Sequence, residues 1–154
     1  MRLYLMQHGD ALDKNVNALR PLSDRGRQDV QKVADFLKTK DFAVNEIWHS
    51  GKLRSRETAE LLKKGACPEA TLVEHRELEP EQLAKNTLKL IKKLEKDLVI
   101  VGHLPHLARL VGLLVCGDEK CEPVLFHKGS VLALERIEDV CWQICWMITP
   151  NLLA

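Results

Sequence analysis

Three side chains of this sequence have the types and the surroundings needed to handle a phosphoryl group. His8, Arg54 and His103 each follow a short apolar segment, and a glycine adjoins each histidine, at Gly9 and Gly102. Two imidazoles and a guanidinium at one rim, with glycines that let the backbone approach closely, describe an anion pocket of phosphate size. A neutral imidazole, whose unperturbed pKa is about 6.5, can also attack phosphorus in line, so these groups could both bind and transfer a phosphoryl group.

Segments of alternating type would position these side chains. Short apolar runs typical of strands alternate with stretches in which apolar residues recur at helical spacing, and Ser23 stands as a possible N-cap before the first of these stretches. The run 97–101 is apolar almost throughout, as in a parallel strand buried on both faces. The pattern predicts strands over 2–7, 46–49, 71–75, 97–101, 129–137 and 141–148, and helices from Ser23 to about residue 40, over 53–65, over 79–96 beginning at Pro80, and over 105–116.

The order of these segments predicts an α/β fold with a mostly parallel central sheet. The last two strands, joined by the charged turn "EDV" at 138–140, would close the sheet as a C-terminal β-hairpin. In open α/β sheets the ligand site lies beyond the carboxyl ends of the strands, where the loops after successive strands meet. We therefore expect the loops that carry His8, Arg54 and His103 to converge on one edge of the sheet.

Length and composition describe a folded protein with little net charge. The 154 residues fit a single domain over 1–154, and 45% hydrophobic with 29% charged residues is close to the globular average and far from a disordered composition. Lys and Arg total 23 against 22 Asp and Glu, which predicts neither a nucleic-acid partner nor a membrane partner. The first ten residues are too poor in apolar side chains for a signal peptide, and no stretch is long enough to span a membrane, so we expect a cytoplasmic protein.

The cysteines allow two interpretations. Their odd number and irregular spacing fit reduced thiols packed in the core better than a disulfide framework. The alternative is a metal site of Cys116, Cys121 and His127, but this spacing matches no common zinc pattern and provides only three ligands. We therefore expect no metal and no other cofactor. The five cysteines are Cys67, Cys116, Cys121, Cys141 and Cys145.

Four motifs resemble the histidine phosphatase superfamily, in its short branch of phosphohistidine phosphatases. They are "LYLMQHGDA", "SGKLRSRET", "HREL" and "VGHLP", which follow one another over nearly the whole chain, and "RPLSDRG" matches the segment that leads into the first helix. The resemblance implies a phosphoglycerate-mutase-like three-layer α/β sandwich in which His8 is the nucleophile and Arg54 and His103 bind the phosphoryl oxygens. Water would then hydrolyse a phosphohistidine intermediate. No metal is required, because side-chain cations supply the electrostatic stabilisation.

One position departs from the family's motif. The family has Arg directly before the nucleophilic histidine, and this chain has Gln7. A charge-assisted hydrogen bond contributes about 1.5–3 kcal/mol, so its loss could weaken phosphate binding or rate by about ten- to a hundredfold unless another group replaces it. The Gln7 amide can still donate. Arg20 is long enough to reach the pocket and compensate, and the alternative that it is a plain surface arginine stays open.

The substrate follows from the leaving group and from the short chain. A phosphate ester needs an acid to protonate its alkoxide, whereas the P–N bond of phosphohistidine makes lighter demands. Glu77 in "HREL" could be that acid or a structural carboxylate. No insertion is evident that would cover the pocket, and an open, shallow site suits a phosphorylated side chain. We therefore expect a phosphorylated protein substrate carrying phosphohistidine, with inorganic phosphate as product, in signal transduction.

Two other functions stay open at this point. One is hydrolysis of small phosphate esters by the same residues. The other is a non-catalytic relative that binds phosphate or a phosphoprotein, for which Gln7 is the only support.

Arg54 and Arg56 could also belong to an ordinary solvated helix face, because Glu57 and Glu60 are spaced for pairing with them.

Overall fold

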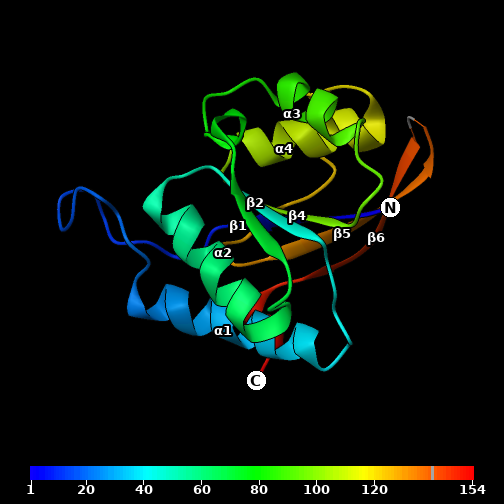
Figure 1. The fold of residues 1–154 in the computed structure, drawn as a ribbon. Coiled ribbons are helices and arrows are strands. Elements are labelled where there is room, and N and C mark those ends of the chain that lie inside the picture. Colours follow the sequence, from blue (N-terminus) through cyan, green and yellow to red (C-terminus); the bar gives the residue numbers. More distant parts are fainter. Residues whose placement is uncertain (140) are drawn as a thin grey trace.

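A six-stranded sheet organises the chain (Figure 1), in a computed structural model that describes residues 1–139 and 141–154. The strand order is β3-β2-β4-β1-β5-β6; the first four strands of this order are parallel, β5 runs antiparallel to β1, and β6 runs antiparallel to β5. The predicted mostly parallel sheet with its C-terminal hairpin is confirmed, although residue 140 of the turn lies outside the described residues. The strands are β1 (Arg2–Gln7), β2 (Glu46–His49), β3 (Thr71–Glu74), β4 (Leu98–Gly102), β5 (Val131–Glu138) and β6 (Cys141–Ile148).

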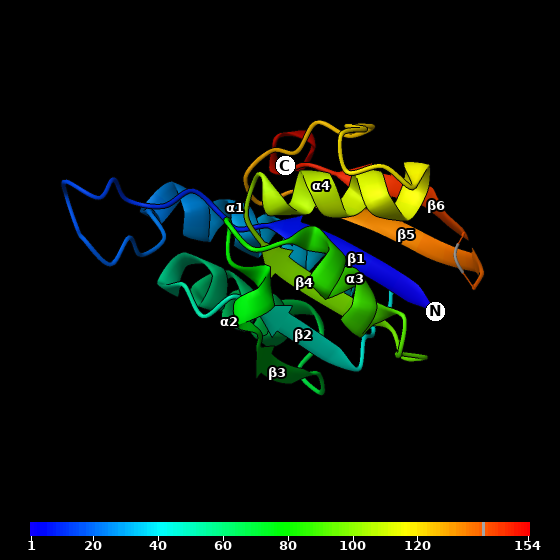
Figure 2. The same ribbon diagram turned by 90° about the horizontal axis from the view of Figure 1, so that it is seen from above.

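Helices cover both faces of this sheet, so the predicted three-layer α/β sandwich is confirmed (Figures 1 and 2). Side chains of a strand alternate between the two faces. Leu3 and Leu5 of β1 therefore pack in the core under α3 and α4, and Tyr4 and Met6 pack in the core over α1 and α2. The helices are α1 (Asp24–Lys38), α2 (Leu53–Ala66), α3 (Ala84–Ile91) and α4 (His106–Val111), which continues as a π-helical turn over Gly112–Cys116.

The sequence pattern predicted the start of α1 correctly but the bounds of α3 wrongly. The Ser23 side chain accepts a hydrogen bond from the Gly26 backbone N–H at 3.0 Å, which caps α1 as predicted. The predicted helix over 79–96 is wrong in its bounds, because Pro80 lies in a turn and Leu83 remains extended and half exposed. The chain first makes a short 3-10 turn, η1 (Arg76–Leu78), and becomes α-helical only where it can bury an apolar stripe against the sheet.

The prediction that all five cysteines are core thiols is wrong for four of them. Cys67 is a buried free thiol, but Cys141 and Cys145 are exposed, because β6 is an edge strand. Cys116 and Cys121 form a disulfide; the chain reverses at a left-handed residue just after the π-helical turn, and the two Cα atoms come within 6.4 Å. This bond occupies the two thiols of the zinc alternative.

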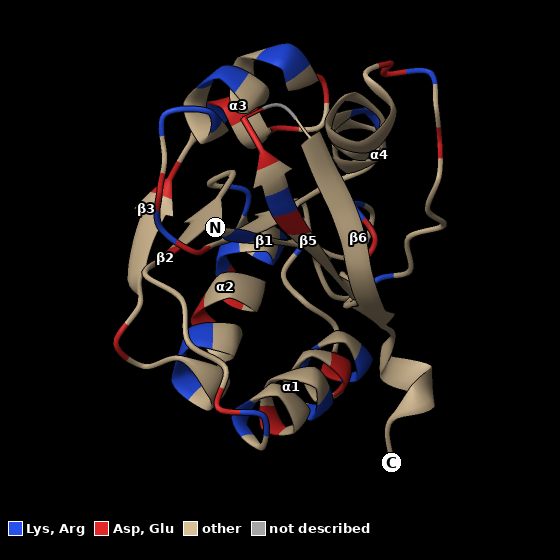
Figure 3. Cartoon of the chain, turned by 90° about the vertical axis from the view of Figure 1, so that its right-hand side faces the viewer, with Lys and Arg blue, Asp and Glu red and all other residues tan. Residues whose placement is uncertain are grey.

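The described residues show no membrane-spanning helix and no cluster of metal ligands, and their charges are mixed. Among them, no helix combines the length and the apolar content that a membrane crossing requires. No group of three or more His, Cys, Asp or Glu side chains in the same part of the chain is arranged to hold a metal ion. Lys and Arg are interspersed with Asp and Glu along α1 and α2 (Figure 3), as the near-equal totals of 23 and 22 suggest.

Candidate active site

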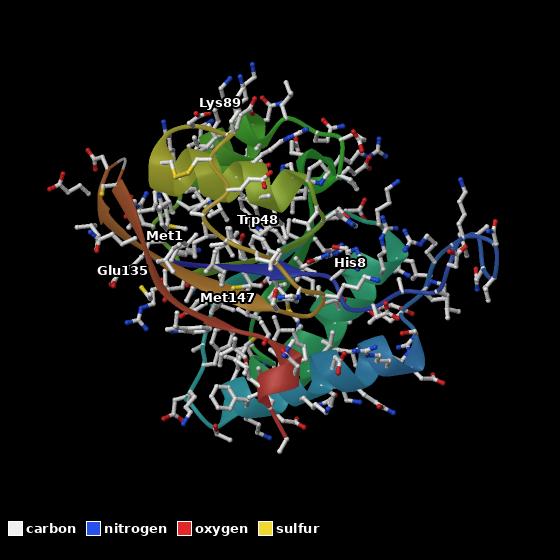
Figure 4. All side chains as sticks on the ribbon, turned by 180° about the vertical axis from the view of Figure 1, so that it is seen from behind. Met1, His8, Trp48, Lys89, Glu135 and Met147 are labelled. Carbon is white, nitrogen blue, oxygen red and sulfur yellow. A yellow bond between two sulfur atoms is a disulfide. The ribbon has the colours of Figure 1, made fainter. Side chains whose placement is uncertain are left out.

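The loops after β1, β2 and β4 meet at one edge of the sheet and bring three predicted side chains together. Arg54 Nε lies 3.3 Å from His8 Nε2, and the ring centroids of His8 and His103 are 5.0 Å apart. Figure 4 shows His8 at the opposite end of the sheet from Met1 and Glu135. The convergence follows from the parallel pairing of the strands, which turns their carboxyl ends to the same edge.

Two hydrogen bonds fix the orientation and the tautomer of His8. Its Nδ1 lies 2.7 Å from the Gly9 carbonyl oxygen, which can only accept, so Nδ1 carries the proton. Its Nε2 faces Arg54 Nε, which can only donate, so Nε2 presents its lone pair. The His8 backbone N–H also donates to the Gly102 carbonyl at 3.1 Å. The histidine is therefore held at both backbone and ring, with one unprotonated nitrogen beside a guanidinium.

The two glycines help to hold His8 in place. The Gly9 N–H donates to Thr58 Oγ1 at 3.1 Å, and a Cβ on Gly9 would come within 2.8 Å of the Val30 side chain in α1. Gly102 provides the carbonyl that accepts from His8, and a Cβ there would lie 3.1 Å from Leu107. Both positions were predicted as substrate-binding, and the structure gives them a packing role next to the site.

His103 is positioned by a residue that the sequence reasoning missed. Its Nε2 lies 2.6 Å from Ser50 Oγ, and the ring is 1% exposed. Ser50 is fixed in turn, because its N–H donates to Ser55 Oγ at 3.3 Å and Ser55 Oγ donates to the Val101 carbonyl at 2.8 Å. The remaining ring nitrogen, Nδ1, is buried and has no hydrogen-bond partner among the described residues. The position of Ser50 in the sequence could have indicated this role, because Ser50 directly follows β2 just as His8 directly follows β1.

The surroundings keep both imidazoles neutral near pH 7. Burial lowers the pKa of His8 to about 4, and the positive charges of Arg54, Lys128 and Arg20 act in the same direction against the hydrogen bond to the Gly9 carbonyl. Burial also lowers the pKa of His103 well below its ordinary value, with His8 and Arg54 as the next causes. A neutral imidazole is the form that can act as a nucleophile.

Two further cations stand near His8. Arg20 adopts a left-handed backbone conformation with φ of 49°, and its Nε donates to the Leu12 carbonyl at 3.1 Å. Its charge acts on both His8 and Arg54, because it contributes to the lowered pKa of each. Lys128, which the sequence reasoning missed, pairs with Asp10 at 2.7 Å and also acts on His8. It precedes β5 in an irregular loop, where no sequence pattern marks it.

Gln7 and Glu77 are the other two predicted residues. Within the described part of the chain, no side-chain contact is recorded between either of them and the rings of His8 and His103. Gln7 is 8% exposed, and its side-chain oxygen Oε1 is buried and has no partner among the described residues. Glu77 is half exposed and lies 3.7 Å from His75 Nδ1, whose ring packs at a tilt of 43° against Trp48 with centroids 4.1 Å apart. The carboxylate is thus directed to His75, on the far side of β2 from β1 in the strand order.

Comparison with known proteins assigns the family. Residues 3–99 match the family model described as the histidine phosphatase superfamily (branch 1). The chain belongs to the histidine phosphatase superfamily. Phosphohistidine phosphatase SixA of Escherichia coli K12 is 25% identical to this histidine phosphatase over 159 residues, which cover 97% of this chain and 94% of that protein. The 6-phosphofructo-2-kinase/fructose-2,6-bisphosphatase of Gallus gallus is 32% identical over 98 residues, but these cover 53% of this chain and 21% of that protein.

Solved structures support the same fold. The protein histidine phosphatase SixA complexed with tungstate superposes with a TM-score of 0.88 at 24% identity, and the match covers 99% of both chains. A phosphoglycerate mutase from Bacillus anthracis superposes with a TM-score of 0.73 at 17% identity, covering 94% of this chain and 91% of that one. The phosphoglycerate-mutase-like fold implied by the motifs is therefore confirmed for this histidine phosphatase.

Proposed function

We propose that this histidine phosphatase removes the phosphoryl group from phosphohistidine in proteins, without a metal, through a phosphorylated His8. One observation carries the proposal: the Gly9 carbonyl holds the proton of His8 on Nδ1, so Nε2 keeps a lone pair, which accepts a long hydrogen bond from Arg54 and is freed when the guanidinium turns to the phosphoryl oxygens. The low pKa of His8 adds to this, because the ring does not have to lose a proton before it reacts near pH 7.

The first half-reaction transfers the phosphoryl group to the enzyme. The Nε2 lone pair of His8 attacks phosphorus in line, so that an N–P bond forms while the P–N bond of the substrate breaks. The departing imidazole keeps the electron pair of that bond and takes up a proton from solvent. Arg54 donates hydrogen bonds to the phosphoryl oxygens. His103 is a second donor through Nδ1 in the tautomer whose Nε2 accepts from the Ser50 hydroxyl.

The second half-reaction releases phosphate. A water oxygen attacks phosphorus, the His8 N–P bond breaks, and its electron pair returns to Nε2. The proton lost by water leaves on the phosphate product or to solvent. Arg54, Arg20 and Lys128 provide positive charge around His8 in both steps, which is the contribution that a magnesium ion makes in other phosphoryl-transfer enzymes.

The placement of Glu77 favours phosphohistidine over esters. An alkoxide leaving group needs an acid within hydrogen-bond reach, and general acid catalysis typically contributes about 10²- to 10⁴-fold. Within the described residues, the recorded partner of the half-exposed Glu77 carboxylate is His75, at 3.7 Å, and no recorded contact joins Glu77 to His8 or Arg54. The similarity to phosphohistidine phosphatase SixA supports the same substrate, which would place this enzyme in cytoplasmic signal transduction. The partial similarity to a fructose-2,6-bisphosphatase is the observation that favours a small phosphate ester instead.

A substrate panel tests the proposal. A phosphohistidine peptide, a phosphoserine peptide and a small phosphate ester are compared at one enzyme concentration, one pH and one salt concentration. We expect the phosphohistidine peptide to have the highest kcat/KM. A higher kcat/KM for the ester would replace the proposed substrate and keep the chemistry. Binding of phosphate without turnover of any of the three would favour the non-catalytic alternative.

A further inference from the structure

A basic groove borders the proposed site of phosphoryl transfer. It has a volume of about 570 Å³ and lies between the loop that joins β1 to α1 and the first turns of α2. Its charged lining side chains are all cations: Lys14, Arg20, Lys52, Arg54 and Arg56. Arg54 belongs both to the groove and to the site, since its Nε lies 3.3 Å from His8 Nε2. The groove is thus a direct continuation of the phosphoryl site.

This accumulation of like charge is not explained by the net charge, and neighbouring carboxylates match only part of it. Glu74 is one such carboxylate, since its side chain lies beside Gly51 of the lining. The net charge is only +1. Glu57, in the same helical turns, is directed away, because it accepts from Arg27 at 2.8 Å and from the Leu22 N–H at 2.7 Å. Glu60 reaches Arg56 at 3.7 Å, in a pair whose side chains are both half exposed and so weakly coupled. Clustered cations repel one another unless an anion binds between them.

The phosphoryl group alone does not account for the outer cations of the groove or for its exposed apolar rim. Val16 and Leu19 on the joining loop are 74% and 71% exposed. The loop projects beyond the body of the protein (Figure 2), and its shape is held by local hydrogen bonds from the Leu19 N–H to Asn17 and from Arg20 Nε to the Leu12 carbonyl. Apolar side chains held in the open beside a charged groove are typical of a surface that contacts another protein.

We propose that this groove docks an acidic segment of the phosphoprotein substrate, with carboxylates bound between Lys14, Lys52 and Arg56 and apolar side chains against the loop. The inference rests on the proposed function and states what the enzyme recognises around the phosphorylated histidine. A small phosphate ester would occupy the space at His8 and Arg54 and leave the outer cations without a ligand.

The test compares two peptides that carry the same phosphohistidine. One has Asp and Glu on both sides of it, and the other has Asn and Gln at the same places. We expect the acidic peptide to have the lower KM, with a similar kcat, because docking acts on binding rather than on the chemical step. The difference should shrink as NaCl rises from 50 to about 500 mM, since added salt screens exposed charges. Equal KM values at low salt would overturn the proposal.

Matched variants locate the effect. The pair Lys14→Gln with Arg56→Gln removes two charges from the groove. The control pair Lys85→Gln with Lys89→Gln removes two charges from α3, and Figure 4 shows Lys89 away from His8. Exposed ion pairs contribute factors of about 1.5 to 5 each, so the groove pair should lower the preference for the acidic peptide about 2- to 25-fold and the control pair should not. Equal losses in the two pairs would refute a specific groove.

Direct binding separates this inference from the function on which it rests. Both peptides are also titrated without phosphate, by fluorescence anisotropy. If the acidic peptide binds more tightly to the groove but neither phosphopeptide is hydrolysed, the proposed function fails and the docking surface stands. If both phosphopeptides are hydrolysed with the same KM and the unphosphorylated peptides bind equally, the docking surface fails and the function stands.

Discussion

Acidification probes the environment that makes His8 a nucleophile. Burial lowers the pKa of its imidazole from the ordinary 6.5 to about 4. A shift of this size corresponds to about 3 kcal/mol against the protonated form. At pH 5.5 an ordinary histidine is about 90% protonated, whereas one with a pKa near 4 is about 97% neutral. We therefore expect the free enzyme to keep a neutral His8, and the rate that depends on it, well below pH 6.5.

The assay is an NMR titration of imidazole ¹⁵N and ¹³C shifts between pH 7.5 and 4.5. Spectra of His8→Ala assign the His8 signals, and saturating inorganic phosphate is added in a parallel series. Phosphate should raise the pKa of His8, because an anion beside the ring favours the protonated form. Values of kcat/KM from initial rates report the free enzyme. Down to pH 5.5 they should not fall through protonation of His8. A His8 signal that titrates near pH 6.5 would refute the reasoning.

The same shift affects stability with a defined sign. In the unfolded chain His8 takes up a proton below about pH 6.5, but in the folded protein only below about pH 4. The contribution to stability is therefore present above pH 6.5 and is lost as the pH falls toward 4, at up to about 1.4 kcal/mol per pH unit. The His8→Asn variant lacks this titration. Between pH 6.5 and pH 4, its free energy of unfolding should therefore decrease by about 3 kcal/mol less than that of the wild type. Parallel curves for the two proteins in urea unfolding would contradict the burial argument.

Three further predictions concern the same pocket. His8→Ala should abolish turnover while the protein stays folded by circular dichroism, and an acid-labile, base-stable phosphoenzyme should be trapped only in the wild type; turnover near the wild-type rate would exclude a covalent role. Activity should survive EDTA, because within the described residues no cluster of metal-ligating side chains exists, and loss that a divalent ion restores would contradict this. Because the charge of Arg20 already acts on His8 and Arg54, Gln7→Arg should leave phosphate or vanadate binding unchanged or weaker in the wild type and should rescue the Arg20→Ala variant. Tightening toward about a hundredfold in the wild type, or additive effects in that double-mutant cycle, would rule out compensation by Arg20.

The sequence by itself determined most of the secondary structure, with the bounds of α3 as an exception, and the meeting of the three side chains. Hydrophobic periodicity is a local property, so α1 with its Ser23 cap and the bounds of β6 were readable from neighbouring residues. His8, Arg54 and His103 follow strands that are parallel, and parallel strands end at one edge, so their convergence followed from the order of the segments. The motifs around them also indicated the family.

The tertiary structure alone decided how the site is held and charged. Ser50 meets His103 across 53 positions, and Lys128 meets Asp10 across 118, and no periodicity or spacing encodes such contacts. The disulfide of Cys116 depends on a chain reversal that the cysteine spacing did not specify. The lowered pKa of His8 arises from burial, which is a property of the assembled layers and not of the residues beside it. Local patterns specify elements and their order, whereas electrostatics and orientation depend on groups that only folding brings near one another.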